Sequence, residues 1–216
     1  SVWFGGALGG GMHAPNVLEA MLLTAAELGD EELRRQALSL CSRVVEGQRE
    51  DGSFGAEGET FAARGRMLRA LAAAYSMSGD KQLLTFMLRY MKYLHDTLRV
   101  RSLSAEDAMH TADTLEAGIL LYNITGQKAI LSVLMMLVSQ GADYTSLYHA
   151  FPYRTPISRS FSADELLDAL AHEDESGYTH HLLRSANGAN LCEGLRASAL
   201  CGVLTGSGKH LSAAEA

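Results

Sequence analysis

The 216-residue sequence contains only three cysteines and three prolines, and it has no long apolar run. The cysteines, Cys41, Cys192 and Cys201, are odd in number and lack any Cys-x-x-Cys spacing. This pattern argues against a disulfide scaffold and against a zinc site built from cysteines alone. We therefore expect buried thiols in a reducing compartment, and among cellular locations the cytoplasm is favoured.

Basic charge is also scarce. The formal net charge is -7 and the pI is near 5.6, so the chain lacks the clustered basic face that a nucleic acid or an anionic membrane surface requires. The longest apolar run, 129–138, is about half of the ~20 residues that a membrane span needs. No stretch alternates apolar and polar residues as a strand does. The sequence predicts a soluble protein whose partner is neither nucleic acid nor membrane.

What the sequence has instead is a repeated turn between apolar helical stretches. The four copies are Leu28-Gly29-Asp30, Ser78-Gly79-Asp80, Thr125-Gly126-Gln127 and Thr205-Gly206-Ser207. Gly supplies the left-handed conformation that follows a helix C-terminus, and Asp or Ser accepts free amide protons of the next helix. The first three glycines lie 50 and 47 residues apart and the fourth follows after 80. The pattern predicts repeated antiparallel hairpins, with an insertion before the last.

The helical stretches differ in how we expect them to pack. One apolar stripe with helical spacing marks an amphipathic helix and consists of Leu84, Met87, Leu88, Met91 and Leu94. The stretch 130–138 is apolar on all sides, which is typical of a helix covered on every face, such as one in the inner ring of a toroid. We predict an all-α fold, with residues 1–216 forming a single all-helical domain of antiparallel hairpins arranged as a toroid.

Polar residues gather at alternate junctions between these stretches, where an array of helical hairpins would bring its loops to one cavity. The junction residues are Gln48, Asp51, Glu59, Arg64, His110, Asp113, His180, His181, Asn187 and Asn190. Their side chains are of the types that hydrogen-bond hydroxyl-rich ligands. The residues that we predict to bind a carbohydrate are Gln48, Asp51, His110, Asp113, His181 and Asn187.

Several of these residues also have a structural interpretation. Asp51-Gly52 is a turn signal in its own right, and His110 with Asp113 is compatible with an exposed helix cap. The pair His180-His181 points apart on a helix and has no His-x-x-x-His partner, so no metal site is predicted. The aromatic segment 141–161 is interpreted as a pocket wall, with a plain surface excursion as the alternative. Because paired carboxylates, a phosphate loop and a nucleophile elbow are all missing, no catalytic residue is assigned.

The order of four segments carries a further signal. They are Gln48-x-x-Asp51-Gly52-x-Phe54-Gly55, then Gly65-Arg66-Met67-Leu68-x-Ala70-Leu71-Ala72-x-Ala74-Tyr75-x-x-x-Gly79-Asp80, then His110 ahead of Leu121-Tyr122-Asn123-x-Thr125-Gly126, then Asn190-x-x-x-Gly194-Leu195-Arg196-x-x-Ala199-Leu200. In this order they resemble the N-terminal catalytic region of beta-L-arabinofuranosidase-like glycoside hydrolases, glycoside hydrolase family 127 and its relatives. The resemblance covers nearly the whole chain.

The resemblance implies an (α/α)6 barrel, incomplete in this chain, and hydrolysis of a terminal sugar such as an L-arabinofuranoside. In that family a cysteine nucleophile works beside a zinc ion held by cysteines and a glutamate. These groups belong to a stretch beyond the matched region, so we expect no cofactor in this chain and zinc only in the complete protein. Residues 209–216 are helical sequence without a stop signal, which also indicates a longer protein. The chain would then supply the substrate-pocket half, and homo-oligomer formation stays open.

One position departs from the family pattern, and other function classes stay open. Many relatives carry a His where this sequence has Asn187, and Asn forms hydrogen bonds but transfers no proton. The spacing Gln48-x-x-x-Gly52-x-Phe54 also resembles a motif of terpenoid cyclases and protein prenyltransferases, although the acidic cluster or zinc triad of those families is missing. A non-catalytic helical-repeat scaffold, whose concave face binds a partner, is the remaining alternative.

Overall fold

The computed structural model describes residues 2–5, 11, 13–149, 164 and 188–215. Within these ranges the secondary structure is helical and contains no strand, so the predicted all-α class is confirmed. Contacts group the chain into two compact units, Ser1–Gly141 and Ala142–Ala216. We describe each unit by itself, and the single domain stays a prediction.

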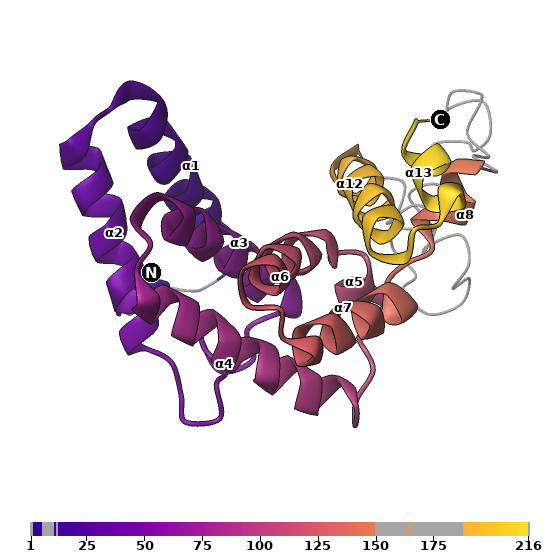
Figure 1. Ribbon diagram of the computed structural model, residues 1–216, viewed down its shortest axis with the longest axis horizontal. Helices are drawn as coiled ribbons and strands as arrows, with labels where there is room; N and C mark the ends of the chain where they lie inside the picture. The colour runs from indigo at the N-terminus through magenta and orange to yellow at the C-terminus, as the bar shows by residue number, and fades with distance from the viewer. Residues whose placement is uncertain (1, 6–10, 12, 150–163, 165–187, 216) are drawn as a thin grey trace. The chain divides into compact units, whose positions relative to one another are not determined.

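The first unit is built from three antiparallel helical hairpins in chain order (Figure 1). A short 3-10 helix, η1 (Val2–Phe4), precedes them, and α5 (Ala105–Ala108) lies in the loop before the third. The hairpins are α1 (His13–Leu28) with α2 (Glu31–Glu46), α3 (Phe61–Ser78) with α4 (Lys81–Leu98), and α6 (Ala112–Thr125) with α7 (Lys128–Gln140). Three of the predicted repeats therefore exist as hairpins.

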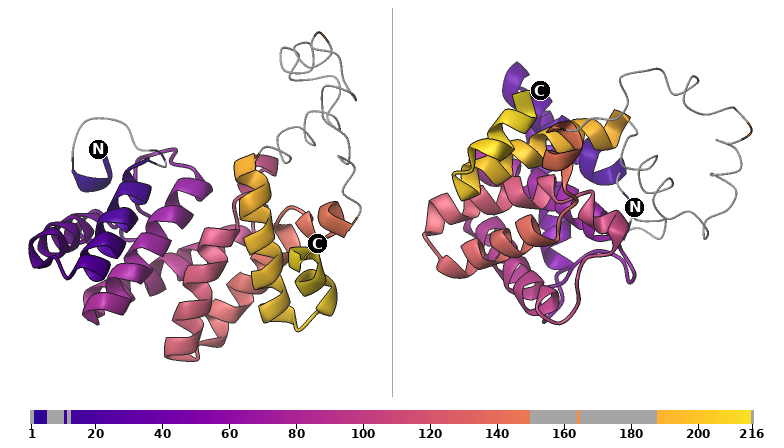
Figure 2. Two further views of the ribbon diagram at one scale, coloured as in Figure 1. Left: turned by 90° about the horizontal axis from the view of Figure 1, so that it is seen from above. Right: turned by 90° about the vertical axis from the view of Figure 1, so that its right-hand side faces the viewer.

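The hairpins stand side by side and form two layers. α3 packs between α1 and α6, and these three helices form what we call the α3 layer. α4 packs between α2 and α7, and these form the α4 layer (Figures 1 and 2). Asn16 and Glu19 of α1 pair with Arg66 and Arg69 of α3 in the same order, and Gly65 near the start of α3 lies against Thr114 near the start of α6. These three helices therefore run in the same direction, and the loops before them lie at one end of the unit.

The hairpin turns follow the predicted chemistry. Gly29, Gly79 and Gly126 have φ values of 63°, 66° and 65°, which L-residues with a side chain rarely adopt. Asp30 and Asp80 each accept a backbone N–H of the following helix, from Leu33 and Gln82 respectively. The side chain of Gln127 forms no such cap. The glycines and both aspartates were therefore predicted correctly.

The most covered helix is α3, and the prediction for residues 130–138 is wrong. That stretch forms α7, which packs on α4 and α6 and leaves Met135 42% exposed. α3 instead contacts α1, α4 and α6, and small residues let these neighbours approach closely. A Cβ atom built on Gly65 would lie 2.6 Å from Oγ1 of Thr114 in α6. Small size, rather than an all-apolar surface, marks the covered helix in this unit.

The second unit contains the fourth predicted hairpin. α12 (Gly188–Thr205) turns at Gly206, with φ of 67°, into α13 (Gly208–Glu215). The short helix α8 (Tyr144–His149) packs against both, and Thr145 Oγ1 lies 2.7 Å from Nδ1 of His210. Residues 144–149 are therefore helical, although the aromatic segment 141–161 was expected to be a loop without helical pattern; residues 150–161 lie outside the described ranges.

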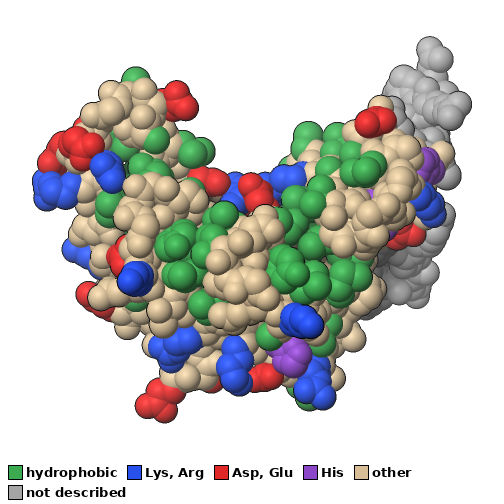
Figure 3. All heavy atoms as spheres, viewed as in Figure 1, with side chains coloured by type: hydrophobic (Ala, Val, Ile, Leu, Met, Phe, Trp, Pro, Cys, Tyr) green, Lys and Arg blue, Asp and Glu red, His purple; other side chains and the backbone are tan. Residues whose placement is uncertain are grey.

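The surface of the first unit mixes charged and apolar side chains, as the green, blue and red patches of Figure 3 show. Its exposed large apolar residues are Val17, Leu23, Leu28, Val100, Ile124 and Met135. Three of them lie on α1, whose main packing partners in the described ranges are α2 and α3. None of the helices in the described ranges is both long and apolar enough to cross a membrane.

Candidate functional site

The loop between α2 and α3, residues 47–60, holds two of the predicted carbohydrate-binding residues, and its own hydrogen bonds engage both. Nε2 of Gln48 donates to the carbonyls of Gly52 at 3.0 Å and of Phe86 in α4 at 2.9 Å. Oδ1 of Asp51 accepts from N and Oγ of Ser53 at 2.8 and 2.7 Å. These two hydrogen bonds lower the pKa of Asp51. Both residues therefore shape the loop.

The rest of the Gln-x-x-Asp-Gly-x-Phe motif anchors the same loop. Gly52 has a φ of 90°, and a Cβ atom there would lie 2.5 Å from the carbonyl oxygen of Arg89. Phe54 is fully buried, with its ring centroid 4.9 Å from that of Phe86 and 4.7 Å from that of Tyr90. Every fixed position of the motif thus has a packing or hydrogen-bonding role. The motif is explained by loop docking without any ligand.

Gln48 lies at a surface hollow that is not lined by the other predicted residues of the described ranges. It lines an open hollow between α2 and α4, formed by Val45, Gln48, Lys81, Gln82, Thr85, Phe86 and Arg89. Asp51, His110 and Asp113 are not part of this lining. His110 lies half-buried in the turn before α6, where its backbone N–H donates to the carbonyl of Asp107 at 3.0 Å. His180, His181 and Asn187 lie outside the described ranges.

Asp113 is the predicted residue that lies in a polar cluster. Its side chain is 2% exposed, and Oδ1 accepts from Nη1 of Arg69 at 2.6 Å. Oδ2 lies 3.6 Å from Nε of Arg66. Arg69 also donates from Nη2 to Oε2 of Glu19. We call these four residues, Glu19, Arg66, Arg69 and Asp113, the charge network.

The charge network joins the three helices of the α3 layer. Glu19 comes from α1, Arg66 and Arg69 from α3, and Asp113 from the first turn of α6. Burial by itself lowers the pKa of Arg69, but the hydrogen bond to Glu19 and the charges of Asp113 and Glu19 outweigh it, so the pKa is raised. Arg69 therefore remains a cation. A buried carboxylate needs such partners, because an unpaired charge is expensive to remove from water.

The network reaches the molecular surface through three of its members. The side chains of Glu19, Arg66 and Arg69 are 18%, 23% and 21% exposed. Nη1 of Arg66 also donates to Oδ1 of Asn16 at 3.5 Å. These groups can therefore contact a ligand while Asp113 holds them from beneath. All are oriented by ion pairs across helices, so they are preorganised hydrogen-bonding groups.

Reasoning from the sequence found Asp113 but missed Glu19, Arg66 and Arg69. The signal was present: Arg66 and Arg69 are separated by one helical turn within an alanine-rich helix that is otherwise buried. Charged side chains on such a helix are rarely buried unless they are paired. The predicted Arg64 lies on another face of α3, where its Nε donates to the carbonyl of Phe54 at 2.8 Å.

No protein-family model, curated protein or solved structure was found to match this chain. Among the residues that the structure describes, no three His, Cys, Asp or Glu side chains lie together as metal ligands would. The candidate site therefore rests on the geometry of the charge network.

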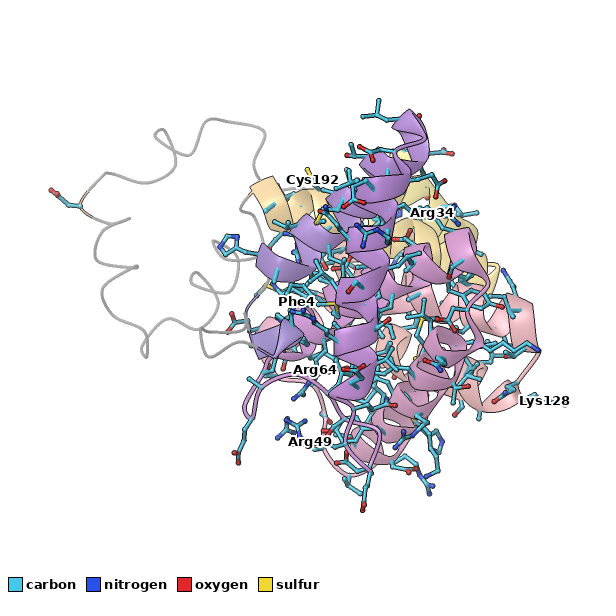
Figure 4. All side chains as sticks on the ribbon, turned by 90° about the vertical axis from the view of Figure 1, so that its left-hand side faces the viewer. Phe4, Arg34, Arg49, Arg64, Lys128 and Cys192 are labelled. Carbon is cyan, nitrogen blue, oxygen red and sulfur yellow. The ribbon has the colours of Figure 1, made fainter. Side chains whose placement is uncertain are left out.

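Arg34 near the start of α2 and Arg49 after its end lie toward opposite ends of the first unit (Figure 4), and the loop of residues 47–60 lies at the Arg49 end.

Proposed function

We propose that this chain is the sugar-binding part of a glycoside hydrolase built on a toroid of helical hairpins. The observation that supports it is the charge network, in which three neighbouring helices each contribute charged groups to one partly exposed cluster. Carboxylate and guanidinium groups form strong, directed hydrogen bonds, and a few such groups fix the orientation of a polar ligand. A terminal sugar, in the first place an L-arabinofuranoside, is the proposed ligand.

The position of the network suits this role. Its members lie in the N-terminal halves of α1, α3 and α6, toward the end where the interhairpin loops gather. Loops at one end of a rigid helical scaffold are where binding sites form most often. The proposed enzyme takes its nucleophile, and the zinc ion beside it, from a segment outside the region of family resemblance. In this chain the proposed function is therefore substrate binding.

The test is binding of methyl β-L-arabinofuranoside, followed by saturation-transfer NMR and by titration calorimetry. Glu19→Gln removes one charged acceptor from the exposed part of the network. Because a hydrogen bond to a charged group contributes about 1.5–3 kcal/mol, we expect the dissociation constant to rise at least about tenfold. Glu27→Gln is the matched control, since Glu27 is exposed on the same helix. Absence of binding to the folded wild-type chain, or equal effects of both variants, would reject the proposal.

A non-catalytic helical-repeat scaffold is the second candidate. The observation that favours it is that the side chains of Gln48 and Asp51 form hydrogen bonds within the chain itself. In a scaffold the charge network would only hold α1, α3 and α6 together. Glu19→Gln would then lower the thermal midpoint, and neither wild type nor variant would bind the arabinofuranoside. The same experiment therefore separates the two candidates.

A further inference from the structure

A cavity of about 220 Å³ lies elsewhere in the first unit, between the start of α3, the second half of α4 and the loop that leads to α5. Its lining includes Arg64, Tyr90, Tyr93, Leu94, Leu98 and Arg101. The cavity is separate from the charge network. Arg64 precedes Arg66 by two positions, which places the two side chains on nearly opposite faces of α3.

One tyrosine of this lining has a hydroxyl that is uncommitted within the described part of the chain. Tyr90 is only 1% exposed, and its hydroxyl forms no hydrogen bond with any residue in the described ranges. The hydroxyl of a buried Tyr usually has a hydrogen-bond partner. Burial raises the pKa of Tyr90, so the group is a neutral phenol that can donate. An occupant of the cavity would satisfy it.

The other uncommitted polar groups around the cavity are mostly donors. Arg64 is held by the carbonyls of Phe54 and Ala56 and keeps Nη1 available. The guanidinium of Arg101 makes no hydrogen bond or ion pair within the described part of the chain. The two carboxylates are already engaged: Glu59 accepts from the backbone N–H groups of Gly11 and Thr60, and Asp107 accepts from Ser104 Oγ. The two arginines are therefore the groups of this lining that can attract an anion.

The remaining lining is apolar and aromatic. Phe61, Leu94 and Leu98 contribute hydrocarbon surface, and the ring of Tyr93 stacks on that of Tyr90 with centroids 6.0 Å apart. Pockets for drug-sized ligands usually have volumes of about 300–1,000 Å³. The smaller volume here suits a single sugar ring, whose apolar face can lie against aromatic and aliphatic side chains while its hydroxyls meet the tyrosines.

We propose that this cavity binds a monosaccharide carboxylate, that is, a uronic acid. The carboxylate lies between Arg64 and Arg101, and hydroxyls of the ring accept from Tyr90 and Tyr93. The proposal does not depend on the function proposed above, because none of these residues belongs to the charge network. Its failure would leave the arabinofuranoside test unaffected.

The experiment is titration calorimetry of the full 216-residue chain with D-glucuronate, D-glucose and inorganic phosphate at constant ionic strength. Glucuronate is expected to bind, and glucose and phosphate are expected to bind at least about tenfold more weakly, the factor that one charge-assisted hydrogen bond provides. Arg101→Gln and Tyr90→Phe should each weaken glucuronate binding by a similar factor. Arg99→Gln removes the same charge two positions from Arg101, outside the lining, and should leave binding unchanged.

Several results would overturn the proposal. These are no binding of glucuronate by the folded chain, equal binding of glucose, phosphate binding at least as tight as glucuronate, and unchanged affinity in Arg101→Gln. Tyr90→Phe keeps the buried ring and deletes only the unpaired hydroxyl, so circular dichroism should show a folded protein. If that variant fails to fold, the exposed Arg101 and its control Arg99 decide the matter by themselves.

Discussion

One side-chain amide joins the loop of residues 47–60 to the middle of α4. Gln48 donates hydrogen bonds to the carbonyls of Gly52 and Phe86. Leaving these part-buried carbonyls without a donor would lower the stability of the fold. Asp51 likewise accepts two bonds from Ser53 and so closes the turn. A polar residue at a loop can therefore be fully explained by the backbone groups around it.

Gln48→Ala is expected to lower the free energy of unfolding by about 1–3 kcal/mol, because two carbonyls lose their donor. Urea denaturation followed by circular dichroism measures this change. Gln82→Ala is the control: Gln82 is exposed on α4, and a surface substitution there should change stability by less than about 0.5 kcal/mol. Equal stabilities of the two variants would contradict the docking role of Gln48.

Asp113→Ala is expected to destabilise the protein by about 3–5 kcal/mol, since it leaves the two part-buried arginines without their shared carboxylate. Asp96→Ala breaks the exposed pair with Lys92 on α4 and should cost less than about 1 kcal/mol. Thermal and chemical unfolding of both variants tests this contrast. Similar losses in the two variants would show that burial does not strengthen the network.

At the scale of the elements, close approach of helices determines which face is buried. In α4 the buried residues include Leu83, Phe86 and Tyr90, whereas Leu84 and Leu88 of the predicted stripe are only half-buried. The reason is that α4 packs against α2, α3 and α7, so the buried arc is wider than one stripe and is shifted from the predicted one. In α3 the small residues shorten the distance to α6 and so increase the buried part of the helix surface.

Gly65→Ala tests this close approach. The added methyl would lie 2.6 Å from Oγ1 of Thr114, so α3 and α6 must shift, and we expect a loss of about 1–3 kcal/mol despite the better helix propensity of Ala. The hydroxyl of Thr114 has no hydrogen-bond partner among the residues that the structure describes. The double variant Gly65→Ala/Thr114→Ala should therefore recover most of the loss. Additive effects in a double-mutant cycle would contradict the steric explanation.

At the scale of the whole molecule, the described part of the chain is helical and its hairpins repeat. The proposed functions concern two sites in the first unit. The charge network lies in the α3 layer, and the 220 Å³ cavity lies between α3 and α4. Both sites are made of groups that bind ligands by hydrogen bonds. Binding without turnover is the expected behaviour of this chain, because the proposed nucleophile belongs to a segment outside the region of family resemblance.

The purified chain is accordingly expected to release no nitrophenol from 4-nitrophenyl L-arabinofuranosides, because hydrogen bonds to the substrate alone do not replace a nucleophile and an acid in lowering the barrier. Absorbance of nitrophenolate over long incubation at high protein concentration measures any turnover. Turnover that disappears in Glu19→Gln and persists in Glu27→Gln would show that catalytic groups lie within residues 1–216.

Local signals determined a large part of the fold. The glycines and aspartates of the hairpin turns act within a few residues of chain, since a left-handed φ and an N-cap hydrogen bond depend only on neighbours. The repeat of these turns was enough to predict an all-α protein of antiparallel hairpins. Which face of each helix is buried was harder to predict from the sequence, as the exposed Met135 of α7 shows.

The candidate sites were decided by the tertiary structure. Glu19 and Asp113 lie 50 and 44 residues from Arg69 along the chain, and the three meet only because α1 and α6 both pack on α3. The sequence shows that Gln48 has a polar amide but not what the amide binds. It donates to the carbonyl of Phe86 because α4 packs beside its loop. Hydrogen bonds and ion pairs need atoms within about 3 Å, and only the packed fold sets distances between residues that are far apart in sequence.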